Sequence, residues 1–223
     1  MTSFMKPSPF FSTMIHRLLF SLSFAVISLF SISARATLTL DVNVSRDQST
    51  ATITSPAFST TSGNELLLAF IATDYLSGPN TTVTSVSGGG LNWVLVRRTN
   101  VQSGTSEIWR AFAPTLLSSV TVTATISQNV ACSLTVMSFA GVDATGTNGS
   151  GAIGATAGSN SSRGAPTASL TTTRNGSWVM GVGNDYDNAI GRTVGPNQSL
   201  VHQYLTPTGD LLGADAERAD SNQ

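Results

Sequence analysis

The feature that most constrains this chain is a series of short apolar runs, separated by turn-forming residues, between Glu65 and Asp143. In Val120–Ile126 the apolar residues alternate with threonines, which places one set of side chains on a buried face and the hydroxyls on the other. This alternation is typical of a half-buried antiparallel strand. The run Leu66–Ala72 is apolar throughout, which predicts a central strand covered on both faces. The strands expected here are Glu65–Asp74, Leu91–Thr99, Glu107–Ala113, Val120–Ile126 and Cys132–Phe139.

Strand-like patterns continue on both sides of this stretch. Between Ala144 and Pro166, small and polar residues dominate, which predicts a long loop within one domain. Many short strands and no helical periodicity predict an all-β, antiparallel two-sheet sandwich over residues 37–205. An eight-stranded jelly roll is the alternative. The further strands expected are Thr37–Val44, Ala51–Thr54, Thr81–Ser87, Ser169–Thr173, Trp178–Val182 and Leu200–Leu205.

The N-terminus has the composition of a secretory signal peptide. Lys6 and Arg17 supply positive charge, Leu18–Ile32 forms an apolar run, and Ala34–Ala36 is a small-x-small cleavage site. We therefore predict that residues 1–36 are removed and that the mature chain is secreted or lies at the cell surface. A retained anchor is the less favoured alternative, because the apolar run is shorter than the ~20 residues of a spanning helix.

The composition of the mature chain limits its partners and its chemistry. It has no lysine and only eight arginines against twelve acidic residues, so nucleic acid and anionic membrane surfaces are poor partners. Its single cysteine, Cys132, cannot form an internal disulfide. That cysteine and His202 are too few to supply the ligands of a zinc site, and no Gly-x-Ser-x-Gly elbow occurs. We therefore expect no catalytic residues and no enzyme activity.

A calcium site is the one metal site that the sequence suggests. Asn184, Asp185, Asp187 and Asn188 place four oxygen-bearing side chains in one turn after a strand, and calcium accepts such ligands. Their spacing does not match a twelve-residue calcium loop, so an ordinary Asx-rich turn without any cofactor is the favoured interpretation.

Three aromatic residues are candidates for stacking on sugar rings: Trp93, Trp109 and Tyr186. Burial in the core is the favoured interpretation for the two tryptophans, because each lies inside an apolar strand. Carboxylates that could serve glycoside hydrolysis all fall at strand ends, and nothing singles out a pair among them: Glu65, Asp74, Glu107 and Asp143.

Several segments together resemble the immunoglobulin-like or fibronectin-III-like β-sandwich modules of large secreted and surface proteins of bacteria. These segments are Gly63–Phe70, Val83–Val86 with Gly90–Trp93, Glu107–Ala111, Val120–Ile126 and Phe139–Asp143. The resemblance covers about Asn64 to Leu205 and implies a sandwich fold without a catalytic role.

The C-terminal residues depart from that family. Leu211–Gln223 is polar and unpatterned where family members continue with further strands, and Thr206–Gln223 as a whole is predicted to be a disordered or truncated tail. A missing last strand would leave a sheet edge unpaired and the fold marginally stable. From these features we expect a secreted, non-enzymatic module with a structural or adhesive role at the bacterial surface. Extracellular polysaccharide or surface proteins are the expected partners, and a carbohydrate-binding module, with or without calcium, is the alternative.

Overall fold

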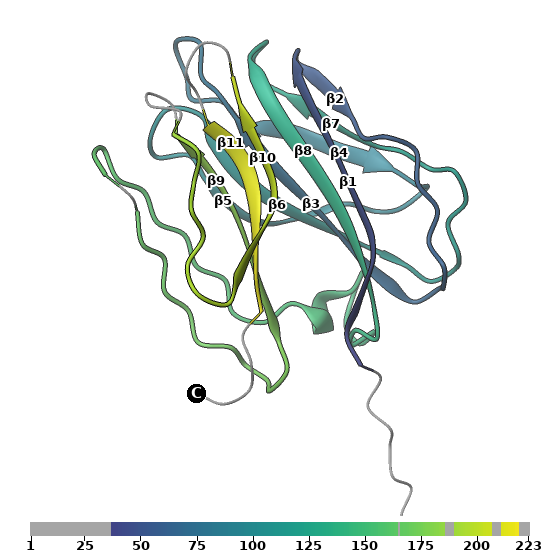
Figure 1. The fold of residues 1–223 in the computed structure, drawn as a ribbon. Helices are drawn as coiled ribbons and strands as arrows, with labels where there is room; N and C mark the ends of the chain where they lie inside the picture. The colour runs from purple at the N-terminus through teal and green to yellow at the C-terminus, as the bar shows by residue number, and fades with distance from the viewer. Residues whose placement is uncertain (1–36, 165, 186–189, 207–210, 219–223) are drawn as a thin grey trace, which may run out of the picture. The chain divides into compact units, whose positions relative to one another are not determined.

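The computed structural model describes residues 37–164, 166–185, 190–206 and 211–218, so the predicted signal peptide lies outside the described residues. Within them, the only helical element is a three-residue 3-10 helix, η1 (Ser150–Ala152), and the rest of the regular structure is antiparallel β (Figure 1). The strands are β1 (Thr39–Ser49), β2 (Thr52–Thr54), β3 (Glu65–Thr73), β4 (Val83–Gly88), β5 (Val94–Thr99), β6 (Thr105–Ala113), β7 (Val122–Ile126), β8 (Ala131–Ala140), β9 (Trp178–Asp185), β10 (Gln198–Leu205) and β11 (Leu211–Arg218).

The strands form three sheets. A five-stranded sheet has the order β1-β8-β3-β6-β5, and two three-stranded sheets have the orders β2-β7-β4 and β10-β11-β9. The five-stranded sheet lies between the other two, with β4, β7 and β2 on one face and β9, β10 and β11 on the other (Figure 1). Among the first eight strands the pairs β1–β8, β2–β7 and β3–β6 are nested within one another.

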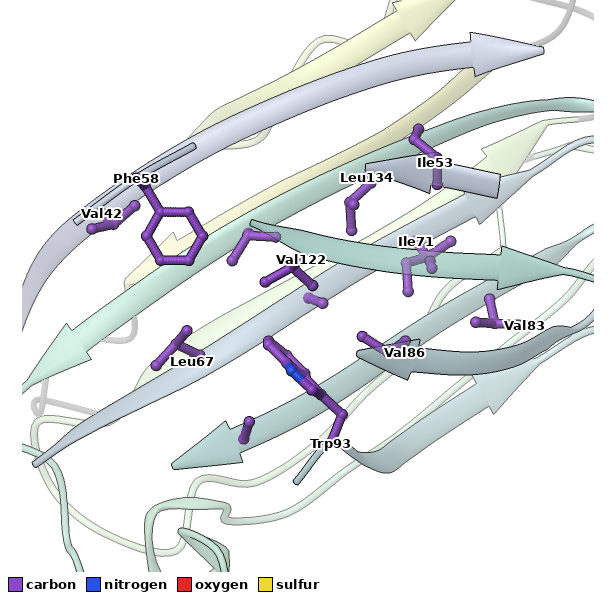
Figure 2. Close-up of a cluster of buried hydrophobic side chains, with 14 of the residues drawn as sticks. Val42, Ile53, Phe58, Leu67, Ile71, Val83, Val86, Trp93, Val122 and Leu134 are labelled. Carbon is purple, nitrogen blue, oxygen red and sulfur yellow. The ribbon is translucent and has the colours of Figure 1, made fainter. Parts of the chain in front are cut away.

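One face of the central sheet packs against the β2-β7-β4 sheet, and we call the apolar layer between them core 1. Alternate residues of β3 contribute Leu67, Ala69 and Ile71 to it, as the period of two in a strand requires. Figure 2 shows the ring of Trp93 lying among the side chains of this layer. Its other buried members are Val42, Ile53, Phe58, Val83, Val86, Ala111, Ala113, Leu117, Val122, Ala124, Ile126, Cys132, Leu134 and Val136.

The opposite face of the central sheet packs against the β10-β11-β9 sheet, and we call this layer core 2. The intervening residues of β3, Leu66, Leu68 and Phe70, lie there with Met137 and Phe139 of β8. The ring of Phe139 meets Trp178 of β9 edge to face, with ring centroids 5.9 Å apart and planes at 85°. Because both faces of β3 are covered, all nine of its residues are buried, which confirms the prediction made from its unbroken apolar run.

The predicted sandwich is thus confirmed in its coarse form as an antiparallel, nearly all-β fold, and ten of the eleven expected strands form. The third sheet was not predicted as a separate layer. The expected strand Ser169–Thr173 is wrong, since these residues are exposed and join no sheet. Strand propensity alone does not fix a strand when the segment has no sheet to pack on.

The C-terminal prediction needs a correction. Leu211–Arg218, expected to be a disordered or truncated tail, is strand β11, and it pairs with β10 on one edge and with β9 on the other. The segment is short of large apolar residues, so its pattern is weak, and its strand conformation comes from backbone pairing on both sides. The rest of the predicted tail beyond Thr206 lies outside the described residues.

We predict that β11 is essential to the third sheet. A chain that ends at Thr206 removes the strand between β9 and β10, and so uncovers part of core 2. Since each large apolar side chain loses ~1.5–3 kcal/mol on exposure, the free energy of unfolding should fall by roughly 5 kcal/mol. Urea unfolding followed by tryptophan fluorescence measures this change. A chain that ends at Arg218 is the control and should match the full chain, and equal stability of both truncated chains would contradict the assignment.

Candidate functional site

At one end of the sandwich, side-chain amides bind neighbouring connections to each other. Gln128, in the turn between β7 and β8, accepts a hydrogen bond from the backbone N–H of Leu76 at 2.8 Å. Its amide nitrogen donates to the carbonyls of Ser77, at 3.0 Å, and Pro79, at 2.6 Å. The connection between β3 and β4 is therefore held along its length by one side chain from a different hairpin.

A second amide extends this arrangement to the connection between β5 and β6. The side-chain nitrogen of Asn80 donates to the carbonyls of Asn100 and Gln102, and its oxygen accepts from the N–H of Gly104 at 3.1 Å. Gly104 has a φ of +84°, and a Cβ there would lie 2.3 Å from the carbonyl oxygen of Thr73, so only glycine fits this close approach. The two connections are thus fixed side by side.

Asn184 binds the end of β9 to the same region. Its side-chain oxygen accepts from the Ser106 hydroxyl at 2.8 Å, and its nitrogen donates to the Ser103 carbonyl at 3.0 Å. Asp185 forms an ion pair with Arg192. The two predicted calcium ligands that the structure describes are therefore already bonded within the protein.

The other two predicted calcium ligands, Asp187 and Asn188, lie outside the described residues, as does Tyr186. Among the residues that are described, no group of three or more histidine, cysteine or acidic side chains is placed to hold a metal ion.

We call residues 74–82, 100–104 and 127–130 the loop end. It carries two highly exposed apolar side chains, Leu76 at 67% and Val101 at 72% exposure. Both project from connections whose backbones the amides above hold in place. Neither residue was among the predicted site residues, although in each case an apolar residue in a turn-forming segment is a visible signal in the sequence. Loops held on a rigid sandwich are the usual location of binding residues.

The two tryptophans do not form an exposed aromatic surface. Trp93 is 8% exposed and lies in core 1, where its ring N–H donates to the Gly88 carbonyl at 3.2 Å (Figure 2). Trp109 is partly buried against the same core, and its ring N–H donates to Glu107 at 2.9 Å. A sugar ring needs a flat aromatic face in solvent, and Trp93 offers none.

Glu107 is fully buried, and its carboxylate accepts five hydrogen bonds. Arg98 donates from Nε to Oε1 at 2.7 Å and from Nη2 to Oε2 at 3.0 Å. This bidentate pair sets the positive charge of the arginine against the negative charge of the glutamate. The N–H of Val83 donates at 2.8 Å, Thr105 at 3.1 Å and Trp109 at 2.9 Å. Arg98 also donates to the Val83 carbonyl at 2.7 Å, so the pair links β4 of one sheet to β5 and β6 of the other. This carboxylate has no free oxygen for catalysis.

The one histidine of the described chain forms a contact between two sheets. Nε2 of His202, on β10, lies 2.9 and 3.1 Å from the two carboxylate oxygens of Asp47 on β1. Among the described residues no serine or threonine hydroxyl is hydrogen-bonded to this imidazole, so a histidine–acid–hydroxyl triad is not assembled there. The pair therefore connects the third sheet to the central sheet.

Two further titratable groups are held in unreactive states. Burial raises the pKa of the Cys132 thiol to about 11, so little of it is the reactive thiolate near neutral pH. Hydrogen bonds from the Thr145 hydroxyl and amide, and then from Arg174, lower the pKa of Asp143 to about 2. Asp143 is therefore ionised at neutral pH and does not act as a proton donor.

No protein-family model, curated protein or solved structure matches this chain. Across the residues that the structure describes, no helix has both the length and the apolar character needed to cross a bilayer. The geometry of the molecule is therefore the basis for proposing a function.

We predict that Glu107→Gln destabilises the protein strongly. The substitution removes the negative charge that pairs with Arg98, and it replaces one carboxylate oxygen, an acceptor, by an amide group that donates. Breaking a buried ion pair in this way costs ~3–5 kcal/mol. The free energy of unfolding in urea measures the loss. Asp185→Asn, which breaks an ion pair at the surface, is the matched control and should cost less than ~1 kcal/mol. If the two variants lose the same amount, Glu107 does not have this role.

Proposed function

We propose that the mature chain is a secreted, non-enzymatic module that adheres to material at the bacterial surface through its loop end. The proposal rests on the exposure of two apolar side chains, Leu76 and Val101, at the loop end. Three connections are held together by Gln128 and Asn80, so two exposed apolar side chains project from a rigid support. Binding by such a preorganised surface loses less conformational entropy than binding by flexible loops.

The state of the reactive side chains supports a role without catalysis. Glu107 is saturated with donors, His202 is paired with Asp47, and the Cys132 thiol is buried and protonated. Each of these groups is engaged in packing or in joining two sheets. The composition of the chain favours the same conclusion, because it has too few histidines and cysteines for the common catalytic sites.

Carbohydrate is a second candidate ligand, and the strand pairing favours it. The nested pairs β1–β8, β2–β7 and β3–β6 match the jelly-roll arrangement, in which the chain folds back on itself, and the departure is the innermost pair, because β4 and β5 lie in different sheets. We therefore propose a jelly roll rather than the immunoglobulin-like type. Lectin domains are among the proteins built in this way, although fold alone does not establish a ligand.

We expect the loop end to control adhesion. The purified chain is mixed with insoluble peptidoglycan sacculi, cellulose and chitin, and the fraction that sediments with each solid is measured. At least one solid should retain the chain, and replacing both Leu76 and Val101 by serine should weaken retention at least tenfold. Leu116→Ser is the matched control, because Leu116 is 57% exposed and follows the opposite end of β6.

The outcomes separate the alternatives. Retention on cellulose or chitin alone favours the carbohydrate-binding module, and retention on sacculi favours adhesion to the cell surface. Equal retention of the double variant and the Leu116→Ser control would remove the loop end as the contact surface. Soluble sugars released from any of the solids would contradict a non-enzymatic role.

A further inference from the structure

The positive charges of this chain are not all matched by carboxylates. Three of its arginines form ion pairs, namely Arg98 with Glu107, Arg174 with Asp143 and Arg192 with Asp185. Arg97 and Arg110 form none with the described residues. Within the same residues the side chain of Arg97 has no hydrogen-bond acceptor, and Arg110 uses only its Nε, which donates to the Asn148 carbonyl at 3.2 Å. Both guanidinium groups therefore keep donors and a charge that no described residue compensates.

Strand pairing places these two arginines on one face of the central sheet. Arg110 of β6 lies opposite Val94 of β5, and Arg97 of β5 lies opposite Ile108 of β6. Ile108 packs against core 2, so Arg97 and Arg110 project from that same face. As diagonal neighbours on adjacent strands they have Cβ atoms ~7–8 Å apart, a spacing at which like charges repel. We call Arg97 and Arg110 the arginine strip.

The connection between β8 and β9 holds Arg110 in place. Asn148 in this connection accepts a hydrogen bond from the backbone N–H of Phe112 at 3.3 Å and donates to the Asn92 carbonyl at 2.6 Å. These bonds fix the position of Asn148, whose carbonyl receives the Nε of Arg110. The half-buried guanidinium of Arg110 is thus oriented before any ligand binds, which lowers the entropic cost of binding.

The same connection borders Arg97 without neutralising it. A Cβ at Gly158 would lie 2.9 Å from Nε of Arg97, so the backbone of the connection lies directly against this exposed side chain. Asn160 accepts a hydrogen bond from the Gln102 side chain at 3.1 Å, which fixes this stretch beside the loop end. From Ala144 to Ser177 the connection contains no acidic residue. It therefore positions both arginines and supplies no negative charge to either.

We propose that the arginine strip binds an acidic polysaccharide through the carboxylates of its sugar units. A guanidinium group matches a planar carboxylate with two parallel hydrogen bonds, and it stays charged at any physiological pH. An extended polymer suits this geometry, because Arg110 contacts Asn148 and Arg97 contacts Gly158, ten residues further along the connection. The strip is separate from Leu76 and Val101, so it stands or fails independently of adhesion through the loop end.

The charge balance favours such a polysaccharide over nucleic acid. The mature chain has eight arginines and twelve acidic residues, a formal charge of 8 − 12 = −4. A DNA duplex carries a charge every ~1.7 Å and needs a broad basic surface, which a chain of net negative charge does not offer. Two arginines on neighbouring strands match the sparser carboxylates of an acidic polysaccharide.

The experiment measures the Kd of the purified chain for agarose beads that carry polygalacturonate, with dextran-coated beads as the neutral reference. The wild-type chain should bind polygalacturonate and not dextran, and added NaCl should weaken the binding by screening the charges. The double variant Arg97→Gln and Arg110→Gln should bind at least tenfold more weakly. Arg46→Gln is the matched control, because it removes an exposed arginine from β1, at the opposite edge of the central sheet, and should bind as the wild type does.

A single variant covers the case in which the double variant does not fold. Arg97→Gln changes only an exposed side chain and should still weaken binding at least threefold, whereas Leu76→Ser with Val101→Ser should leave it unchanged. Equal loss in Arg46→Gln and Arg97→Gln would overturn the proposal, because total charge and not the strip would then control binding. Loss in the Leu76 and Val101 variant alone would assign the polysaccharide to the loop end. Binding to dextran sulfate or duplex DNA but not to polygalacturonate would contradict a carboxylate ligand.

Discussion

The sandwich depends on a positive charge placed against the buried carboxylate of Glu107, because this carboxylate would oppose folding if it lay in core 1 without a partner. The guanidinium of Arg98 supplies the charge, and the backbone of Val83 both donates to the carboxylate and accepts from the arginine. β4 and β5 belong to different sheets, and they are not paired with each other. The Arg98–Glu107 pair therefore joins the two sheets where no backbone ladder does, and it fixes the side of core 1 nearest β5.

The same principle recurs on the other face of the central sheet. Core 2 supplies the apolar contact between the layers, and two polar contacts orient the third sheet: His202 with Asp47, and Asn184 with Ser106. Apolar packing is not directional, whereas hydrogen bonds are, so these pairs specify how the sheets are aligned. These polar contacts thus join parts of the chain to one another, and the loop end is the surface that we propose for binding.

Sequence patterns predicted the strands of the two sheets around core 1 well, because the periodicity of their apolar residues follows directly from which faces are buried. The alternation of Val120–Ile126 and the unbroken apolar run Leu66–Ala72 indicate one covered face and two covered faces, respectively. Leu211–Arg218 was missed because pairing with β9 and β10, rather than its own side chains, makes it a strand. Glu65 and Glu107 look alike in the sequence, since each stands at the start of an apolar run. Only the tertiary structure separates them, because Arg98 and Val83 reach one and not the other.

Because β3 is covered on both faces by separate sheets, we expect its backbone amides to be exposed only when the whole fold opens. Hydrogen–deuterium exchange of the backbone amides, resolved by peptide, measures this. Amides of β3 and β8 should exchange slowest and show one common free energy of opening, because only global unfolding exposes them, while those of the edge strand β5 should exchange earlier. Exchange of the β3 amides as fast as those of β5 would contradict the three-layer arrangement.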